Sequence, residues 1–183
     1  MGSTVNKKSI LKTILEELKS GNATKIKKAL KSLQLNGDVS VIRPLVDVLK
    51  SKISPEIDLE IVNFLSDLKD TSVKEEIIAI LNDEEYLEVR HQVLTSIWNC
   101  KIDYSEFIAE FVAVACDGNF MESFECLTII ENLEGPFEER HILECQLHLK
   151  EYIESNNAVD KQKSEIMSDI ATLIKSFDLD TDD

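Results

Sequence analysis

The segment 41–68, VIRPLVDVLKSKISPEIDLEIVNFLSDL, decides the fold, because the segment 73–100, VKEEIIAILNDEEYLEVRHQVLTSIWNC, repeats its apolar pattern at a shift of 32 residues. The matching positions are Val41, Leu45, Leu49, Ile61, Leu65 and Leu68, which return as Val73, Ile77, Leu81, Val93, Ile97 and Cys100. A fixed period of this length is typical of stacked repeat arrays, in which each unit buries its apolar face against its neighbours. The repeat therefore predicts one continuous core with a long side surface, as in a binding scaffold.

Apolar residues recur at three-to-four spacing along the whole chain, which predicts helices and no strand. Turn signals such as Gly21-Asn22 and Asp117-Gly118 divide the chain into about ten helices. Consecutive helices form pairs at roughly 8–34, 39–69, 72–100, 104–133 and 137–177. We expect a single all-α domain over 1–183, an α-α superhelix (solenoid) of about five antiparallel helix pairs, with frayed ends at 1–6 and 178–183.

Several helix starts carry capping signals. Ser54 precedes a proline and can cap the following helix. Ser72 and Glu75, and likewise Asn119 and Glu122, have the spacing of a capping box. These positions are the expected first residues of three helices.

The repeated segments resemble a known family. Residues 41–49, with Pro44 inside the first helix, look like the proline-bearing first helix of a HEAT repeat, and Val89-Arg90 followed by Val93 and Ile97 looks like the start of its second helix. The resemblance to HEAT and HEAT-like α-solenoids is most specific over 38–101. It implies that second helices line a concave face, in a family that mostly holds proteins together. The units are shorter than usual HEAT repeats and nearer in length to those of phycobilisome lyases.

Charge is divided unevenly along the chain. The net charge is −15, but residues 1–37 hold 8 Lys against 2 Glu, whereas residues 38–183 hold 12 basic and 33 acidic groups. An acidic body repels phosphate backbones and favours basic partners, so nucleic-acid binding is not expected over most of the chain. The lysines that form a basic end are Lys7, Lys8, Lys12, Lys25, Lys27 and Lys28. Nucleic-acid binding through this basic end is an alternative function.

The non-core positions of successive second helices should align into rows on the concave face. They are Lys25, Lys28 and Ser32, then Glu60, Asn63 and Asp67, then Gln92, Thr95 and Asn99, then Glu125, Thr128 and Asn132. Amides, hydroxyls and carboxylates in such a row can hydrogen-bond an extended peptide. We therefore expect the row from Glu60 to Asn132 to bind a partner protein or peptide that is basic or exposes backbone donors.

Trp98 stands beside Asn99 in this row and has two interpretations. As an exposed residue it would anchor a partner, since tryptophan often dominates interface energies. As a core residue it would be wedged between repeat units, which the usual burial of tryptophan favours. The aromatic residues from Tyr104 to Phe137 are expected to be mostly core.

A metal site is considered and not expected. His141, Cys145 and His148 fall at i, i+4 and i+7 of one helix, a spacing that could offer three ligands to zinc. However, no fourth ligand can be placed by spacing, and Cys145 also lies on an apolar line with Ile142 and Leu149. We expect this helix to be part of the core.

Catalysis is not expected either. The sequence has no glycine-rich phosphate loop, no GxSxG and no HExxH motif, and its four cysteines form no CxxC pair. We therefore expect a non-catalytic adaptor without a cofactor. The rival is a lyase-like HEAT-repeat protein that handles a chromophore or assists an enzyme, which would need a reactive thiol or a pocket. An exposed, thiolate-prone Cys116 or Cys145 would favour it.

The chain lacks the roughly 18 consecutive apolar residues of a membrane span, and its first residues lack the apolar run of a secretory signal. We expect a soluble, cytoplasmic protein with no membrane partner.

Overall fold

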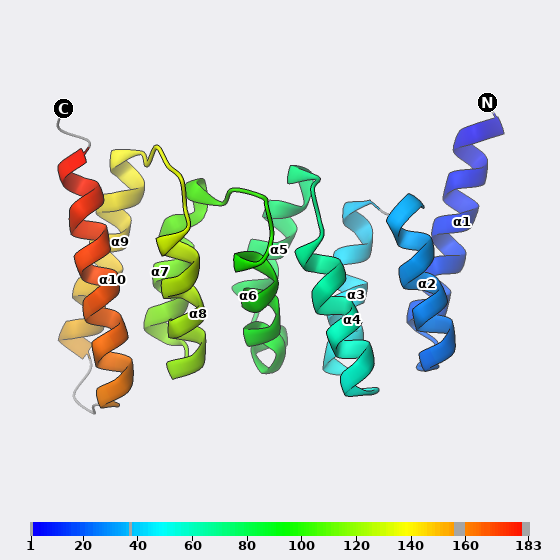
Figure 1. Cartoon of the computed structure of the whole chain (residues 1–183), viewed down its shortest axis with the longest axis horizontal. Coiled ribbons are helices and arrows are strands. Elements are labelled where there is room, and N and C mark those ends of the chain that lie inside the picture. Colours follow the sequence, from blue (N-terminus) through cyan, green and yellow to red (C-terminus); the bar gives the residue numbers. More distant parts are fainter. Residues whose placement is uncertain (1, 37, 156–159, 181–183) are drawn as a thin grey trace. The chain divides into compact units, whose positions relative to one another are not determined.

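The computed structural model describes residues 2–36, 38–155 and 160–180, which form ten α-helices and no β-strand (Figure 1). The α-helices are α1 (Gly2–Leu18), α2 (Ala23–Asn36), α3 (Ile42–Lys50), α4 (Pro55–Ser66), α5 (Lys74–Leu81), α6 (Arg90–Trp98), α7 (Ile108–Asp117), α8 (Phe120–Glu131), α9 (Glu139–Ser155) and α10 (Lys161–Asp180). The 3-10 segments are η1 (Val39–Val41), η2 (Thr71–Val73), η3 (Glu84–Val89) and η4 (Ser105–Phe107). The prediction of an all-helical chain is confirmed for the described residues.

The chain is helical close to both ends of its described part. Helix α1 begins at Gly2 and helix α10 continues to Asp180, so the two helices include 2–6 and 178–180, which are expected from the sequence to fray. No proline or further glycine interrupts either segment, so each helix continues along its own hydrogen-bonded ladder. Met1 and residues 181–183 lie outside the described residues.

The chain divides into two compact units, unit 1 (Met1–Cys100) with α1 to α6 and unit 2 (Lys101–Asp183) with α7 to α10. A single domain is expected from the sequence, and no break in the apolar period marks residue 100. Repeats in an array contact only their neighbours, so a boundary between two of them requires no change of pattern.

Within unit 1, α1 packs against α2, α3 against α4 and α5 against α6. Helices α2, α4 and α6 pack side by side in one layer, and α1, α3 and α5 lie behind them (Figure 1). Within unit 2, α7 packs against both α8 and α9, and α10 packs against both α8 and α9.

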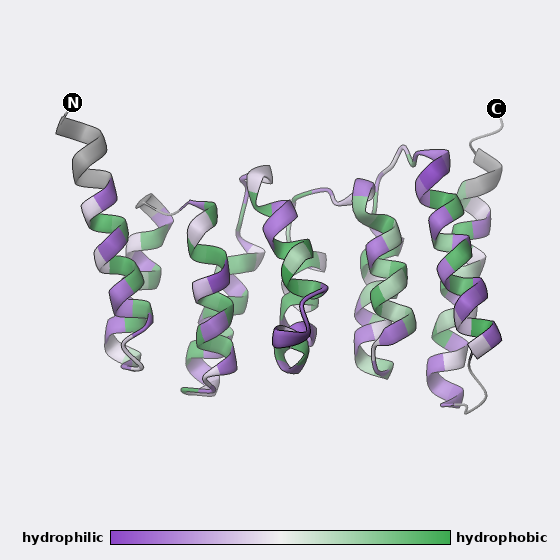
Figure 2. Cartoon of the chain, turned by 180° about the vertical axis from the view of Figure 1, so that it is seen from behind, coloured by the Kyte–Doolittle hydropathy of each residue, from purple (hydrophilic) through white to green (hydrophobic). Residues whose placement is uncertain are grey.

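The residues of the repeated pattern form the core of unit 1. Those that are buried are Val41, Leu45, Leu49, Ile61, Leu65, Val73, Ile77, Leu81, Val93 and Ile97. The last matched pair, Leu68 and Cys100, is half-buried, and the Cys100 Sγ donates to the Leu68 carbonyl at 3.2 Å. Figure 2 shows hydrophobic and hydrophilic residues alternating along the helices, as expected of amphipathic helices with one buried face.

Helix starts follow the predicted caps in two places and differ in a third. The Ser54 side chain accepts from the Ile57 amide, and Asn119 with Glu122 forms a complete capping box. The capping box predicted at Ser72 is wrong, because Asp70 accepts from the Ser72 amide and a 3-10 turn precedes α5. The same Asp-to-Ser bond occurs at residues 38–40 and 103–105, so Asp-x-Ser marks these first-helix starts.

Behind the core of unit 1, a cluster around Tyr86 joins α3 to α5 and η3. Arg43 bonds Glu76 at 2.7 Å and Asp83 at 2.8 Å, and its guanidinium lies 5.3 Å from the centre of the Tyr86 ring. The Tyr86 hydroxyl donates to Asp47 at 2.9 Å. This cluster links residues that are 33 to 40 positions apart in the sequence.

The core of unit 2 contains only part of the aromatic set expected to be core, because Phe124 is 46% exposed and Phe120 and Phe137 are half-buried. Tyr104, Phe107 and Phe111 are buried, and the Tyr104 ring meets the Phe111 ring edge-on at 6.2 Å. Lys163 of α10 donates to the carbonyls of Cys116 and Gly118 and so satisfies the end of α7. Among the described residues, no helix is both long and apolar enough to cross a membrane.

Candidate partner-binding surface

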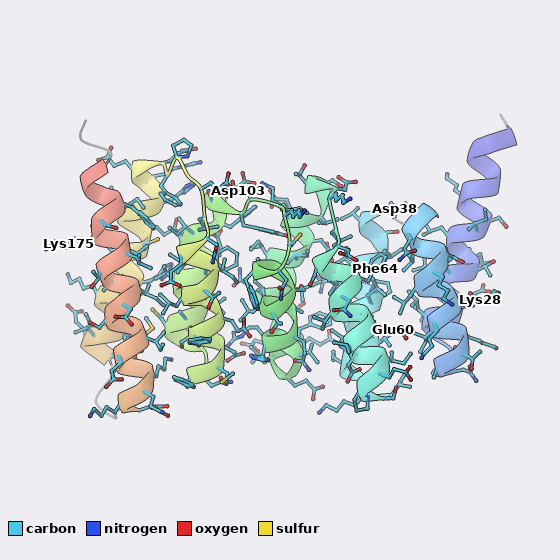
Figure 3. All side chains as sticks on the ribbon, viewed as in Figure 1. Lys28, Asp38, Glu60, Phe64, Asp103 and Lys175 are labelled. Atoms are coloured by element: carbon cyan, nitrogen blue, oxygen red, sulfur yellow. The ribbon has the colours of Figure 1, made fainter. Side chains whose placement is uncertain are left out.

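The surface that carries most of the predicted binding residues is one layer of unit 1. We call it the α2–α4–α6 face and define it by the outward residues Lys25, Lys28, Leu59, Glu60, Asn63, Asp67, Gln92, Thr95, Trp98 and Asn99. Figure 3 labels Lys28 on α2 and Glu60 and Phe64 on the neighbouring α4. The structure thus brings the predicted residues of unit 1 onto adjacent helices.

Glu60 and Lys27 neutralise one another on this face. The Lys27 Nζ lies 3.1 Å from a Glu60 carboxylate oxygen and also contacts Glu56, so α2 is tied to α4. Hydrogen bonds from Lys27 to Glu56 and Glu60 raise the pKa of the lysine. The negative charge of the row from Glu60 to Asn132 is therefore smaller than the sequence predicts. Within unit 1, Asp67 is the acidic residue of this row that is exposed.

The polar row on α6 uses its donors within its own helix. The Asn99 amide nitrogen donates to the Thr95 carbonyl at 3.0 Å, and the Thr95 hydroxyl donates to the His91 carbonyl at 3.0 Å. The Asn99 side chain therefore turns its carbonyl oxygen, an acceptor, toward solvent. Asn63, on α4, is also exposed. The Asn99 carbonyl oxygen and the exposed Asp67 carboxylate are acceptors that suit a partner bringing N–H groups.

Trp98 is exposed, with 41% of its surface accessible. The interpretation of Trp98 as core, which its usual burial favours, is wrong. The residue occupies the last turn of α6, where the preceding repeat has Ser66 at the equivalent position. That position faces away from the packed side of the helix, so a large ring placed there remains in solvent.

In unit 2 the corresponding helix is α8, which repeats part of the pattern. The Asn132 amide donates to the Thr128 carbonyl at 2.8 Å, and the Thr128 hydroxyl donates to the Phe124 carbonyl at 3.0 Å. Glu125 is buried, with 9% of its surface accessible, so the prediction that it stands exposed on a binding ridge is wrong. Thr128 and Asn132 remain accessible side chains.

The basic end is partly compensated by glutamates. Lys28 lies 2.6 Å from Glu17, and Lys12 lies 4.0 Å from Glu16. Lys8 and Lys25 are exposed. The side chain of Lys7 lies outside the described residues. With Lys27 also paired, this end has fewer available cations for a phosphate backbone than its sequence indicates.

The thiols have environments that oppose reactivity. Burial raises the pKa of Cys116 to about 11 and that of Cys145 to about 12. A thiol must lose its proton to act as a nucleophile, and at neutral pH both would hold it. The rival function that relies on a reactive cysteine therefore lacks its key group in unit 2.

The three residues considered for metal binding differ in exposure. Cys145 is buried against α7, whereas His141 and His148 are half-buried on either side of it. Within the described part of the chain, no three or more His, Cys, Asp or Glu side chains gather closely enough to hold a metal ion.

Leu59 was not among the predicted surface residues. It is 61% exposed at the centre of α4. The sequence repeat indicates the exposure of Leu59. The equivalent residues in the neighbouring repeats are Thr24 and His91, so Leu59 occupies a non-core position.

Comparison of the chain with protein-family models, with curated proteins and with solved structures finds no match.

Proposed function

We propose that the protein is a non-catalytic protein-binding scaffold, a HEAT-like α-solenoid of five antiparallel helix pairs that holds a segment of a partner protein on the α2–α4–α6 face. The observation that supports this proposal most is Trp98, a tryptophan 41% exposed on a face that also exposes Leu59. Tryptophan is usually well buried, and exposed tryptophans are enriched among the residues that dominate binding energy.

The chemistry of the face indicates the kind of segment. Asn99 presents an acceptor, the exposed amide of Asn63 presents both a donor and an acceptor, and Asp67 presents an exposed carboxylate. An extended segment can satisfy the acceptors with backbone N–H groups and the carboxylate with a Lys or Arg side chain. Trp98 and Leu59 would then contact its apolar side chains.

Selection from a library of random displayed peptides tests this function directly. The full-length protein is expected to select basic, extended peptides, and Trp98→Ala should weaken them by about 30-fold, the loss of about 2 kcal/mol typical of an anchor residue. Leu87→Ala is the matched control, because Leu87 is 46% exposed but lies in η3, outside this face. Equal binding to the wild type and to Trp98→Ala would reject the proposed face.

Charge reversal separates this face from the basic end. Asp67→Lys should weaken the selected peptides, whereas Lys8→Glu, in the basic end and outside this face, should leave them unchanged or strengthen them. Both residues are exposed, and neither substitution disturbs the Lys27–Glu60 pair. Loss of binding in Lys8→Glu alone would show that the basic end is the working surface.

A further inference from the structure

A trough runs between α9 and α10 in unit 2. It consists of two adjoining hollows of about 410 and 360 Å³, which share the lining residues Leu149, Ile153 and Ala171. Buried Met167 and Ile174 contribute to its floor. On α10 the wall consists of small side chains, Ser164, Ser168 and Ala171, which leave the space between the helices open.

Helix α9 has a second apolar face beside this trough. Ile142, Cys145 and Leu149 are buried, whereas Leu143, Leu147 and Ile153 are 54%, 52% and 72% exposed. Leu143 and Leu147 lie on the same stripe of the helix as Lys150 and Glu154, which line the trough. We call Leu143 and Leu147 the leucine row.

This combination is unusual for a surface helix. A helix that packs on one core needs one apolar stripe, whereas α9 carries large apolar side chains on two. Leu143 and Leu147 on the exposed stripe, next to an open apolar trough that Ile153 lines, indicate a surface that is covered by another apolar surface.

The charges around this surface are self-complementary. Lys150 and Lys175 stand at the trough, and Figure 3 shows Lys175 on the side of α10 away from α8. Glu144 and Glu151 are exposed three residues before and four residues after Leu147, so they flank the leucine row. Glu154 also lines the trough and lies 3.9 Å from Lys150, so Lys175 gives the trough its net positive charge. The same face thus carries a trough of net positive charge and an apolar row with acidic flanks.

Local net charge also permits two copies to approach. The whole chain carries −15, but residues 139–177 hold five basic and seven acidic side chains and are nearly neutral. This segment therefore opposes the approach of a second copy less than the rest of the chain, which is strongly acidic.

We propose that two copies of this chain form a dimer through their α9–α10 faces, with the leucine row of each copy in the trough of the other. The contact is isologous, because each copy supplies both the row and the trough about a two-fold axis. Lys175 of each copy then faces Glu144 and Glu151 of the other.

The first test is the mass of the full-length protein in solution, measured by sedimentation over a concentration series. The wild type is expected to reach twice the 20.7 kDa mass of one chain. Leu147→Glu with Ile153→Glu should remain at the mass of one chain. The control pair is Leu59→Glu with Leu87→Glu, which places the same charges on exposed leucines of unit 1 and should still dimerise. Circular dichroism confirms that each variant is folded.

A charge exchange tests the pairing itself. Two variants are compared, the single variant Lys175→Glu and the double variant Glu144→Lys with Glu151→Lys. The dimer of each should be at least about tenfold weaker than that of the wild type, because like charges then meet. A mixture of these two variants should form a heterodimer, because each trough again faces a row of opposite charge. A wild type with the mass of one chain at every concentration would overturn the proposal. So would a mixture that dimerises no better than its separate components.

Discussion

In unit 1, charged side chains from successive first helices meet around the Tyr86 ring. In unit 2, the Tyr104 ring instead contacts the rings of Phe107 and of Phe111, which lies on the first helix α7. Lys50 shows the first strategy, since it pairs with Glu85 at 2.8 Å and lies 4.8 Å from the centre of the Tyr86 ring. The two units thus place similar helix pairs with different chemistry. Changes in salt and pH, and cavity-forming substitutions, should therefore affect the stability of the two units differently.

The largest effect should come from the aromatic core of unit 2. Phe111 has 0% of its surface exposed, and Phe111→Ala should cost about 3 to 5 kcal/mol because the cavity cannot fully collapse. Leu65→Ala, in the core of unit 1, is the matched comparison and should cost about 2 to 5 kcal/mol. Urea unfolding followed by circular dichroism measures both. Losses under about 0.5 kcal/mol would contradict these core assignments.

The cluster around Tyr86 should give a smaller effect that depends on salt. Arg43→Ala removes contacts with Glu76, Asp83 and the Tyr86 ring, and because the side chain is 37% exposed we expect a loss of about 1 kcal/mol. The loss should shrink at 1 M salt. Arg43→Lys keeps the charge without the planar fork and should recover only part of the stability. A loss that is independent of salt would assign the contribution of Arg43 to packing alone.

A comparable effect is expected from a local cap in unit 2. Asn119→Ala removes the acceptor for the amides of Met121 and Glu122 and should cost about 1 kcal/mol. This loss should be nearly insensitive to salt, in contrast to that of Arg43→Ala. Asn119→Ser, which restores a capping oxygen, should recover most of it.

The smallest effect concerns acid stability. The Glu85 amide and then Arg43 bond Asp83 and lower its pKa. A carboxyl whose pKa is lower in the folded state stabilises the fold above its unfolded pKa and loses that contribution as pH falls through the folded value. Asp83→Asn should therefore melt at a lower temperature than the wild type at pH 7, and the two should converge as pH falls below the ordinary pKa range of an aspartate. Parallel melting curves at every pH would contradict the assigned charge pairing.

Much of the fold could be predicted from local pattern. The period of 32 residues identified the buried positions, and Ser54 and Asn119 marked helix starts, because a cap and an apolar stripe are properties of a few consecutive residues. The Arg43–Asp83 contact could not be predicted, since these two residues are 40 positions apart and are brought together only by packing of the helices.

The candidate surface was predicted less completely. The register placed Asn63, Asp67 and Asn99 correctly on one face, because non-core positions follow from the core. It could not give the burial of Glu125, which depends on neighbouring side chains. For Trp98, the general tendency of tryptophan to be buried outweighed its place beside Asn99, which is exposed.

Trp98 is the only tryptophan in the chain, so its fluorescence reports on the α2–α4–α6 face alone. The decisive measurement is acrylamide quenching of this fluorescence, without and with a saturating peptide from the library selection. Acrylamide should readily quench Trp98 in the free protein. The bound peptide should shift the Trp98 emission to shorter wavelength and protect the residue from quenching. A peptide that binds by calorimetry but leaves the emission and quenching of Trp98 unchanged would contradict the claim that this face holds the partner.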